Sequence, residues 1–168
     1  MNLRIGLDID DTICDFMNEY IKIYGQPKND SEITRNVTQE LSKNKNFWLH
    51  LPIINRPDFE PVLYCTKRVN PKCWTKQYIR ENGLPDKAVY QIYCQTANKA
   101  SRIKGRVDVF IDDSVTNFMD LNKAGVPCLL MDQPYNRWWK TVGRVFSLEY
   151  MEIYKCYKKL MKSVCLLH

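Results

Sequence analysis

The sequence predicts an α/β protein built on a doubly wound parallel sheet. Two observations predict it: short apolar runs alternate with segments of helical spacing, and several of these runs end directly in Asp or Thr. Strands that alternate with helices form βαβ units, whose parallel sheet is covered on both faces. With 168 residues, the chain is long enough for one such domain with a small insertion.

The first element is a strand over residues 3–8, which runs into Asp8, Asp10, Asp11 and Thr12. Like charges this close repel one another unless a cation lies between them. A helix N-cap would use one or two of these polar side chains, but it would leave the others unexplained. The strand end therefore indicates a metal or catalytic site.

Residues 12–25 have helical spacing, and Gly25 followed by Pro27 ends that helix. A second helix is expected near 31–43. The block 14–60 is polar and too small for a core of its own.

We therefore expect two parts. Residues 14–60 form a small helical cap, inserted after the first strand. Residues 1–13 and 61–168 form the catalytic core.

The rest of the chain alternates regularly between strands and helices, with glycines at the ends of two helices. We expect strands at 61–65, 88–93, 107–111 and 127–131, and helices at 71–83, 97–104, 114–124 and 147–163.

Polar residues gather where the predicted strands end, and in an open parallel sheet the functional site lies at that edge. These residues are Asp8, Asp10, Thr66, Lys67, Asp112, Asp113 and Asp132. Carboxylate oxygens suit Mg²⁺, whereas zinc would favour His or Cys. The two histidines, His50 and His168, follow no predicted strand. The pattern thus predicts a magnesium site with a carboxylate able to act as nucleophile on phosphorus.

Four segments resemble the motifs of the haloacid dehalogenase (HAD) superfamily of phosphotransferases. They are Leu7-Asp8-Ile9-Asp10-Asp11-Thr12, Leu63-Tyr64-Cys65-Thr66, Lys99, and Phe110-Ile111-Asp112-Asp113. They occur in the family's order and together span about residues 3–132. The resemblance implies a HAD-like, Rossmann-like sheet and a hydrolase of phosphate esters.

The resemblance also implies catalytic roles. Asp8 would be the nucleophile and Asp10 the general acid and base. Thr66 would bond the phosphoryl oxygens, and Lys99 would hold nucleophile and phosphate together. Two alternatives stay open: Thr66 could only cap the following helix, and Lys104 could replace Lys99.

For the cofactor, the resemblance implies Mg²⁺ held by Asp8, by Asp112 and by Asp10 through its backbone carbonyl. Asp113 and Thr12 would support these ligands. The alternative for Asp113 is a helix cap.

A narrower resemblance connects the chain to the 5′(3′)-deoxyribonucleotidase branch, which acts under a small helical cap. It is carried by Cys14-Asp15-Phe16, Phe47-Trp48 and Pro134-Tyr135-Asn136-Arg137, together with the motifs above. One departure is Asp11, which occupies a position where many relatives have glycine.

This branch implies substrate-binding residues. Phe16, Phe47 and Trp48 would form an apolar slot for a base, because aromatic faces stack on bases. Alternatively, these aromatics only join cap to core. Lys67 and Arg137 would meet the substrate's phosphate or sugar, or would be ordinary surface cations.

The expected function is a Mg²⁺-dependent phosphomonoesterase acting on nucleotides. In the nucleotidase interpretation, the expected substrates are deoxyribonucleoside monophosphates. Alternatives are a phosphatase of polynucleotide ends or of another small molecule, and a catalytically silent binding module. The net charge of +6 favours anionic partners without choosing among them.

The composition of the chain indicates the compartment in which the protein is expected. No apolar run reaches the length of about 18 residues that predicts a membrane span, and the N-terminus leads into the first strand without a signal peptide. The seven cysteines are scattered and lack zinc or redox spacing. We expect small buried thiols and a cytoplasmic protein.

Overall fold

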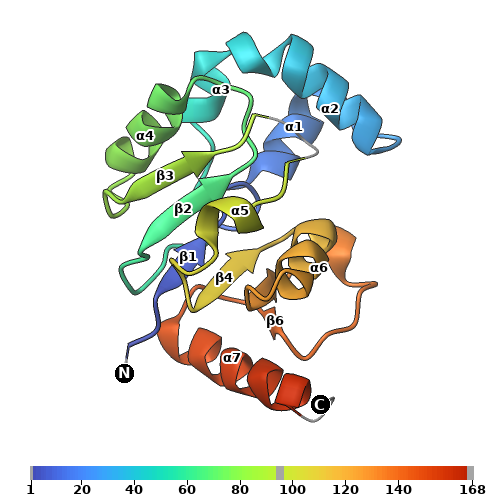
Figure 1. Cartoon of the computed structure of the whole chain (residues 1–168). Coiled ribbons are helices and arrows are strands. Elements are labelled where there is room, and N and C mark those ends of the chain that lie inside the picture. Colours follow the sequence, from blue (N-terminus) through green and yellow to red (C-terminus); the bar gives the residue numbers. More distant parts are fainter. Residues whose placement is uncertain (1, 94–96, 166–168) are drawn as a thin grey trace.

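The computed structural model describes residues 2–93 and 97–165, and Figure 1 shows their arrangement. Within these residues, six parallel strands form one sheet in the order β3-β2-β1-β4-β5-β6. The strands are β1 (Ile5–Leu7), β2 (Leu63–Thr66), β3 (Ala88–Gln91), β4 (Val109–Asp112), β5 (Cys128–Met131) and β6 (Arg144–Val145). This order is that of a doubly wound sheet, so the predicted fold class is confirmed.

The helices follow the predicted alternation, with differences at their ends. They are α1 (Phe16–Tyr24), α2 (Asp30–Gln39), η1 (Leu41–Lys43), α3 (Lys45–Leu49), α4 (Lys72–Glu81), α5 (Ala100–Ile103), α6 (Val115–Lys123), η2 (Pro134–Asn136) and α7 (Tyr150–Cys165). The single helix expected near 31–43 is divided into α2 and η1. The strand β6 was not predicted, because two residues carry too little pattern to be seen.

Alternate residues of the strands enter two separate hydrophobic clusters, one on each face of the sheet. Leu7 and Ile111 join the cluster that contains side chains of α1, α3, α4 and α7. Phe110 and Leu130 join the cluster that contains side chains of α5 and α6. The sheet is therefore buried on both faces, as expected for parallel strands.

The segment 14–60 packs directly on this core. Its helices α1, α2 and α3 lie together at the top of the view in Figure 1. Phe16, Val37 and Trp48 belong to the same hydrophobic cluster as the β1 residues. The division into a cap at 14–60 and a core stays a prediction.

Five cysteines in the described residues are free thiols: Cys14, Cys65, Cys73, Cys128 and Cys156. The first two and Cys128 are buried, as expected for small apolar side chains. Cys94 lies outside the described residues. No helix in the part of the chain that the structure describes is long and apolar enough to cross a membrane.

Candidate active site

Lys99 joins the ends of the two central strands. Its Nζ lies 2.9 Å from Asp8 Oδ1 and 2.8 Å from Asp112 Oδ2. Asp8 follows β1 and Asp112 ends β4, and all three side chains are buried. Lys104 is placed elsewhere, since its Nζ donates a hydrogen bond to the Ala124 carbonyl. Of the two candidate lysines, the structure brings Lys99 to the carboxylates.

Three carboxylates are placed to share a cation. One oxygen from each of Asp8, Asp112 and Asp113 lies within 4.8 Å of the others. Asp8 and Asp112 were expected together. Asp113 was expected alongside them, and the Asp10 carboxylate does not belong to this group of oxygens.

The electrostatics of the group favour a cation. Burial raises the pKa of Asp8 to about 7, while Lys99 lowers it and Asp112 raises it further. Burial and then Asp112 raise the pKa of Asp113 well above its usual value. Burial lowers the pKa of Lys99, but Asp112 and Asp8 raise it above its usual value. One lysine does not offset three carboxylates, so a bound cation would stabilise their ionised form.

The ligand atoms fit a hard divalent ion. All three are carboxylate oxygens, which Mg²⁺ prefers. The Thr12 hydroxyl is buried and has no hydrogen-bond partner among the described residues. A buried polar group without a partner is costly and indicates a missing ligand or water. The three carboxylates therefore suit Mg²⁺, and the supporting role of Thr12 stays a prediction.

The N-terminal turn of α6 orients Asp112. Asn117 Nδ2 lies 3.1 and 3.3 Å from the two carboxylate oxygens, and the Ser114 amide donates a hydrogen bond of 3.0 Å to Oδ1. Ser114 also caps the helix, a role left open for Asp113. Asn117 was missed by sequence reasoning, although it lies one helical turn beyond the predicted strand end.

Asp10 has a different partner. The Arg68 guanidinium holds its carboxylate through Nε at 2.9 Å and Nη2 at 2.6 Å, and Thr66 Oγ1 donates a hydrogen bond of 3.3 Å. Asp10 was expected to bind the metal through its backbone carbonyl, so the pairing of its side chain leaves that prediction untested. Arg68, a residue that the sequence analysis did not single out, is fully buried.

Asp11 occupies an unusual backbone conformation, with φ at +52°. This left-handed region favours glycine, and Asp is one of the few other residues that adopt it. Asp11 therefore adopts a conformation that glycine adopts more readily than other residues. The Asp11 carboxylate accepts a hydrogen bond of 2.9 Å from the Met17 amide, so it fixes the start of α1.

The segment η2 lies beside the carboxylates. The Tyr135 hydroxyl donates a hydrogen bond of 2.6 Å to Asp113 Oδ2, and Asn136 Nδ2 donates one of 2.8 Å to the Asp113 carbonyl. Arg137, the predicted substrate residue, is exposed and instead pairs with Asp132 at 2.8 Å. Tyr135 is therefore the residue of this segment that bonds the Asp113 carboxylate, while Asn136 bonds its backbone.

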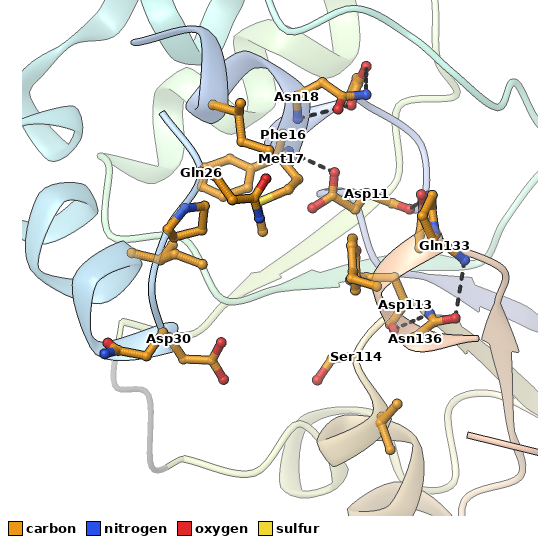
Figure 2. A pocket seen from close by; sticks show the side chains of 18 of the residues that line it. Asp11, Phe16, Met17, Asn18, Gln26, Asp30, Asp113, Ser114, Gln133 and Asn136 are labelled. Atoms are coloured by element: carbon orange, nitrogen blue, oxygen red, sulfur yellow. Dashed lines mark hydrogen bonds between the residues drawn. The ribbon is translucent and has the colours of Figure 1, made fainter. Parts of the chain in front are cut away.

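A cleft of about 740 Å³ opens beside Asp11 and Asp113. Figure 2 shows Phe16, Met17 and Gln26 on one side of it, with Asp11 and Asp113 opposite. Asp8, Asp112 and Lys99 are not among the residues that line it. A molecule in the cleft would lie between the helical segment 14–60 and the ends of the strands. This volume is within the usual range for small-molecule sites.

The predicted aromatic slot is only partly present. Phe16 lines the cleft, but Phe47 and Trp48 are buried and do not line it. Their ring centroids lie 5.9 and 5.8 Å from that of Phe16. They join the segment 14–60 to the core, as the alternative interpretation had it. Lys67 lies in the loop after β2 and is not among the residues lining the cleft.

Comparisons with known proteins give little sequence similarity. No family model matches the chain, and no curated protein matches it. Among solved structures, the fold is similar to that of a HAD-superfamily hydrolase from Ehrlichia chaffeensis. Sequence identity is 12%, the match covers 98% of this chain and 99% of that one, and the TM-score is 0.41. With identity and TM-score this low, the similarity gives no information about the functional site, whose chemistry follows from the geometry described above.

Proposed function

We propose that the protein is a Mg²⁺-dependent phosphomonoesterase of the HAD type that hydrolyses nucleotides. The observation that carries the proposal is the Lys99 ammonium between Asp8 and Asp112, beside Asp113 and a cleft of about 740 Å³. Asp113 lines the cleft and has an oxygen within 4.8 Å of one from Asp8, so a phosphate that reached Asp113 would come near the buried nucleophile.

In the proposed mechanism, an Asp8 oxygen attacks phosphorus and the bond from phosphorus to the ester oxygen breaks. Asp10 accepts hydrogen bonds from Arg68 on both oxygens, so it would first have to take up a proton from solvent before giving it to the departing oxygen. It would then take a proton from the water that releases phosphate from Asp8.

Lys99 holds Asp8 in place. The Thr66 hydroxyl, which donates to Asp10 in the structure, would have to turn to donate to the phosphoryl oxygens. Asp8, Asp112 and Asp113 would hold Mg²⁺, which supplies charge neutralisation for the phosphate.

The cleft supports a nucleotide as substrate, with a deoxyribonucleoside monophosphate as the first candidate. Phe16, Met17 and Ile21 give it apolar surface, and Asn18 and Gln26 add amide groups. An aromatic face suits a base, and amides can bond its edge. The phosphate would then reach the carboxylates on the opposite side of the cleft.

The test is phosphate release from a panel of nucleoside monophosphates and sugar phosphates, with Mg²⁺ and with a chelator. We expect release that requires Mg²⁺, is fastest for nucleotides, and is lost in Asp8→Asn. Asp8→Asn should keep the fold by circular dichroism. A folded wild-type protein that releases phosphate from no member of the panel would contradict the proposal, and ligand binding without turnover would favour a silent binding module.

A second candidate is the phosphate at a polynucleotide end. Trp138 lines the cleft and is 68% exposed, so it offers a stacking face for a neighbouring base. The net charge of +6 agrees with this substrate. Faster release from a phosphorylated oligonucleotide than from mononucleotides, lost in Trp138→Ala, would favour it over the first candidate.

A further inference from the structure

The last helix, α7, carries a row of lysines on its outer face. These exposed residues are Lys155, Lys158, Lys159 and Lys162, and they are called the lysine stripe below. Their spacing of three, four and seven positions places them along one side of the helix. At a rise of about 1.5 Å per residue, the stripe is about 10 Å long.

The opposite face of α7 is occupied by the core. Ile153 and Leu160 are buried in the hydrophobic cluster that also contains the β1 residues, and Cys156 and Tyr157 pack against it. Among the described side chains of α7, Met151 is the one large apolar group that is exposed. A helix that binds a lipid surface inserts an apolar face. In α7 that face is already buried, so the helix offers charge to a partner.

The charges of the lysine stripe are not neutralised within the protein. Glu152 is the acidic residue of α7, and its carboxylate accepts hydrogen bonds of 2.5 Å from the Phe146 amide and 2.6 Å from the Ser147 hydroxyl. No ion pair within residues 2–93 and 97–165 includes a lysine of the stripe. Lys158 Nζ lies 5.4 Å from the centroid of the Tyr154 ring, a contact that leaves its charge in place.

The stability of the helix does not account for the lysine stripe. Lys162 alone lies in the last turn, where a basic side chain offsets the helix dipole. Like charges four residues apart on a helix repel one another, and the stripe contains two such pairs, Lys155 with Lys159 and Lys158 with Lys162. The arrangement therefore opposes helix formation slightly, and a bound polyanion would relieve the repulsion.

The lysine stripe lies apart from the cleft. In Figure 1, α7 runs along the bottom of the view, whereas α1 and α2, whose residues line the cleft, lie at the top. No described residue of α7 is among those that line the cleft. A molecule bound along the stripe would thus leave the candidate active site open.

We propose that the lysine stripe is a docking surface for nucleic acid, which it binds through the phosphate backbone without reading the sequence. With four lysines and one glutamate, α7 carries half of the chain's net charge of +6. Duplex DNA has about one negative charge per 1.7 Å of its axis, so a stripe of about 10 Å meets at least as many phosphates as it has lysines. Lysine is a mobile point charge, which suits phosphates of any sequence. The inference goes beyond the proposed function and does not depend on it.

The test is fluorescence anisotropy with a labelled DNA duplex of about 20 base pairs, with hydroxyl groups at every end and EDTA in the buffer. No terminal phosphate and no Mg²⁺ is then present for the candidate active site. We expect the wild type to bind with a micromolar Kd in about 50 mM NaCl, and more weakly as the salt rises. The variant K155Q/K158Q/K159Q/K162Q should bind about tenfold more weakly or worse. The slope of log Kd against log salt should fall by about 3 to 4, because each lost phosphate contact removes about 0.9.

The matched control is K43Q/K45Q/K76Q/K123Q, which removes the same charge from exposed lysines of η1, α3, α4 and α6. Its Kd should stay within about threefold of the wild-type value, because scattered charges act through a screened field. Equal losses in the two variants would overturn the inference, since net charge alone would explain the binding. A wild type that does not bind the duplex in about 50 mM NaCl would also overturn it.

Circular dichroism checks that both variants fold, and Lys→Gln keeps a good helix former at each position. Should the stripe variant fail to fold, K155Q/K159Q and K158Q/K162Q are compared instead, and each should lose about half of the slope change. Sedimentation with phosphatidylserine vesicles distinguishes a membrane partner: vesicle binding without duplex binding overturns the inference. A wild type that binds the duplex but releases no phosphate from nucleotides refutes the proposed function alone.

Discussion

At the scale of single residues, the carboxylates depend on partners that fix their orientation. Asp112 sits at the end of β4, and its oxygens are held by Lys99, Asn117 and the Ser114 amide. A metal ligand that is oriented in advance loses less freedom on binding, so the residues around it affect affinity. Asn117 is the clearest case, because its amide touches both oxygens of Asp112.

Replacing Asn117 with Ala should weaken Mg²⁺ binding by about tenfold, because Asp112 loses the donor that orients it. Titration calorimetry measures the change. The control is Asn122→Ala on the same helix, where the amide bonds the Phe118 and Cys128 carbonyls. That variant should lower stability and leave Mg²⁺ affinity unchanged. Equal losses of affinity in both variants would show a general effect on α6.

The site residues that were predicted from the sequence differ physically from those that were not. Asp8, Asp112 and Lys99 were found because strand ends and motif order place them without knowledge of packing. Arg68 and Tyr135 could not be found this way. Their roles depend on side chains that approach from elsewhere in the fold: Trp48 and Tyr78 around Arg68, and Asp113 opposite Tyr135.

At the scale of elements, β1 and β4 determine where Asp8 and Asp112 lie, and their pairing is close. The pair Gly6 and Phe110 is in register, and a Cβ on Gly6 would lie 2.8 Å from side-chain atoms of both Phe110 and Val107. This is closer than carbon atoms approach one another, so a larger residue would push the strands or their side chains apart. Gly6 is therefore required by packing.

The variant Gly6→Ala should destabilise the protein by about 1–3 kcal/mol, the usual cost of overpacking a filled core. Urea unfolding followed by circular dichroism measures the loss. Phe110→Leu in the same background should recover part of the stability, because it removes atoms from the crowded side. Full wild-type stability of Gly6→Ala alone would contradict the close packing of β1 and β4.

The starts of the same two strands are joined by an ion pair. Arg4 bonds Asp108 through its side chain at 2.7 Å and its amide at 2.8 Å. The Arg4 side-chain bond is the main cause that lowers the pKa of Asp108. A lowered carboxyl pKa gives stability that is present above the unfolded value of about 3.9 and is lost as the pH falls through the folded value.

Asp108→Asn should accordingly cost less than about 1 kcal/mol at neutral pH, because both partners are partly exposed and screened. The difference from the wild type should stay constant above about pH 5 and disappear below about pH 3. Denaturant unfolding at a series of pH values tests this. If the stability difference between the wild type and Asp108→Asn grew as the pH fell, the result would contradict a stabilising pair of Arg4 with ionised Asp108.

Element boundaries were harder to predict than element types. The chain between 31 and 43 has no Gly or Pro to mark a break, yet it divides into α2 and η1. Leu41 in η1 is buried, and the Trp48 indole bonds its carbonyl. Packing of α3 against this turn therefore decides where α2 ends, and such long-range contacts do not appear in local periodicity.

At the scale of the whole molecule, alternation of strands and helices predicted the parallel sheet but not the order of its strands. The order places β1 and β4 side by side, which brings Asp8 and Asp112 together although about a hundred positions separate them. The carboxylates then share one buried region with Lys99 as their only close described cation. Their mutual repulsion opposes folding, and a bound divalent ion relieves it.

Mg²⁺ should therefore stabilise the folded protein in a concentration-dependent way. At a hundred times its dissociation constant, the gain in unfolding free energy is about 2.7 kcal/mol, because the ion binds the folded state alone. Thermal unfolding with increasing MgCl₂ measures it, with NaCl of equal ionic strength as the control. Asp112→Asn should remove most of the shift, since it takes one of the three oxygen ligands. If the unfolding temperature rose equally in the wild type with MgCl₂, in Asp112→Asn with MgCl₂ and in the wild type with NaCl, the stabilisation would come from salt screening. That result would contradict a cation site at these strand ends.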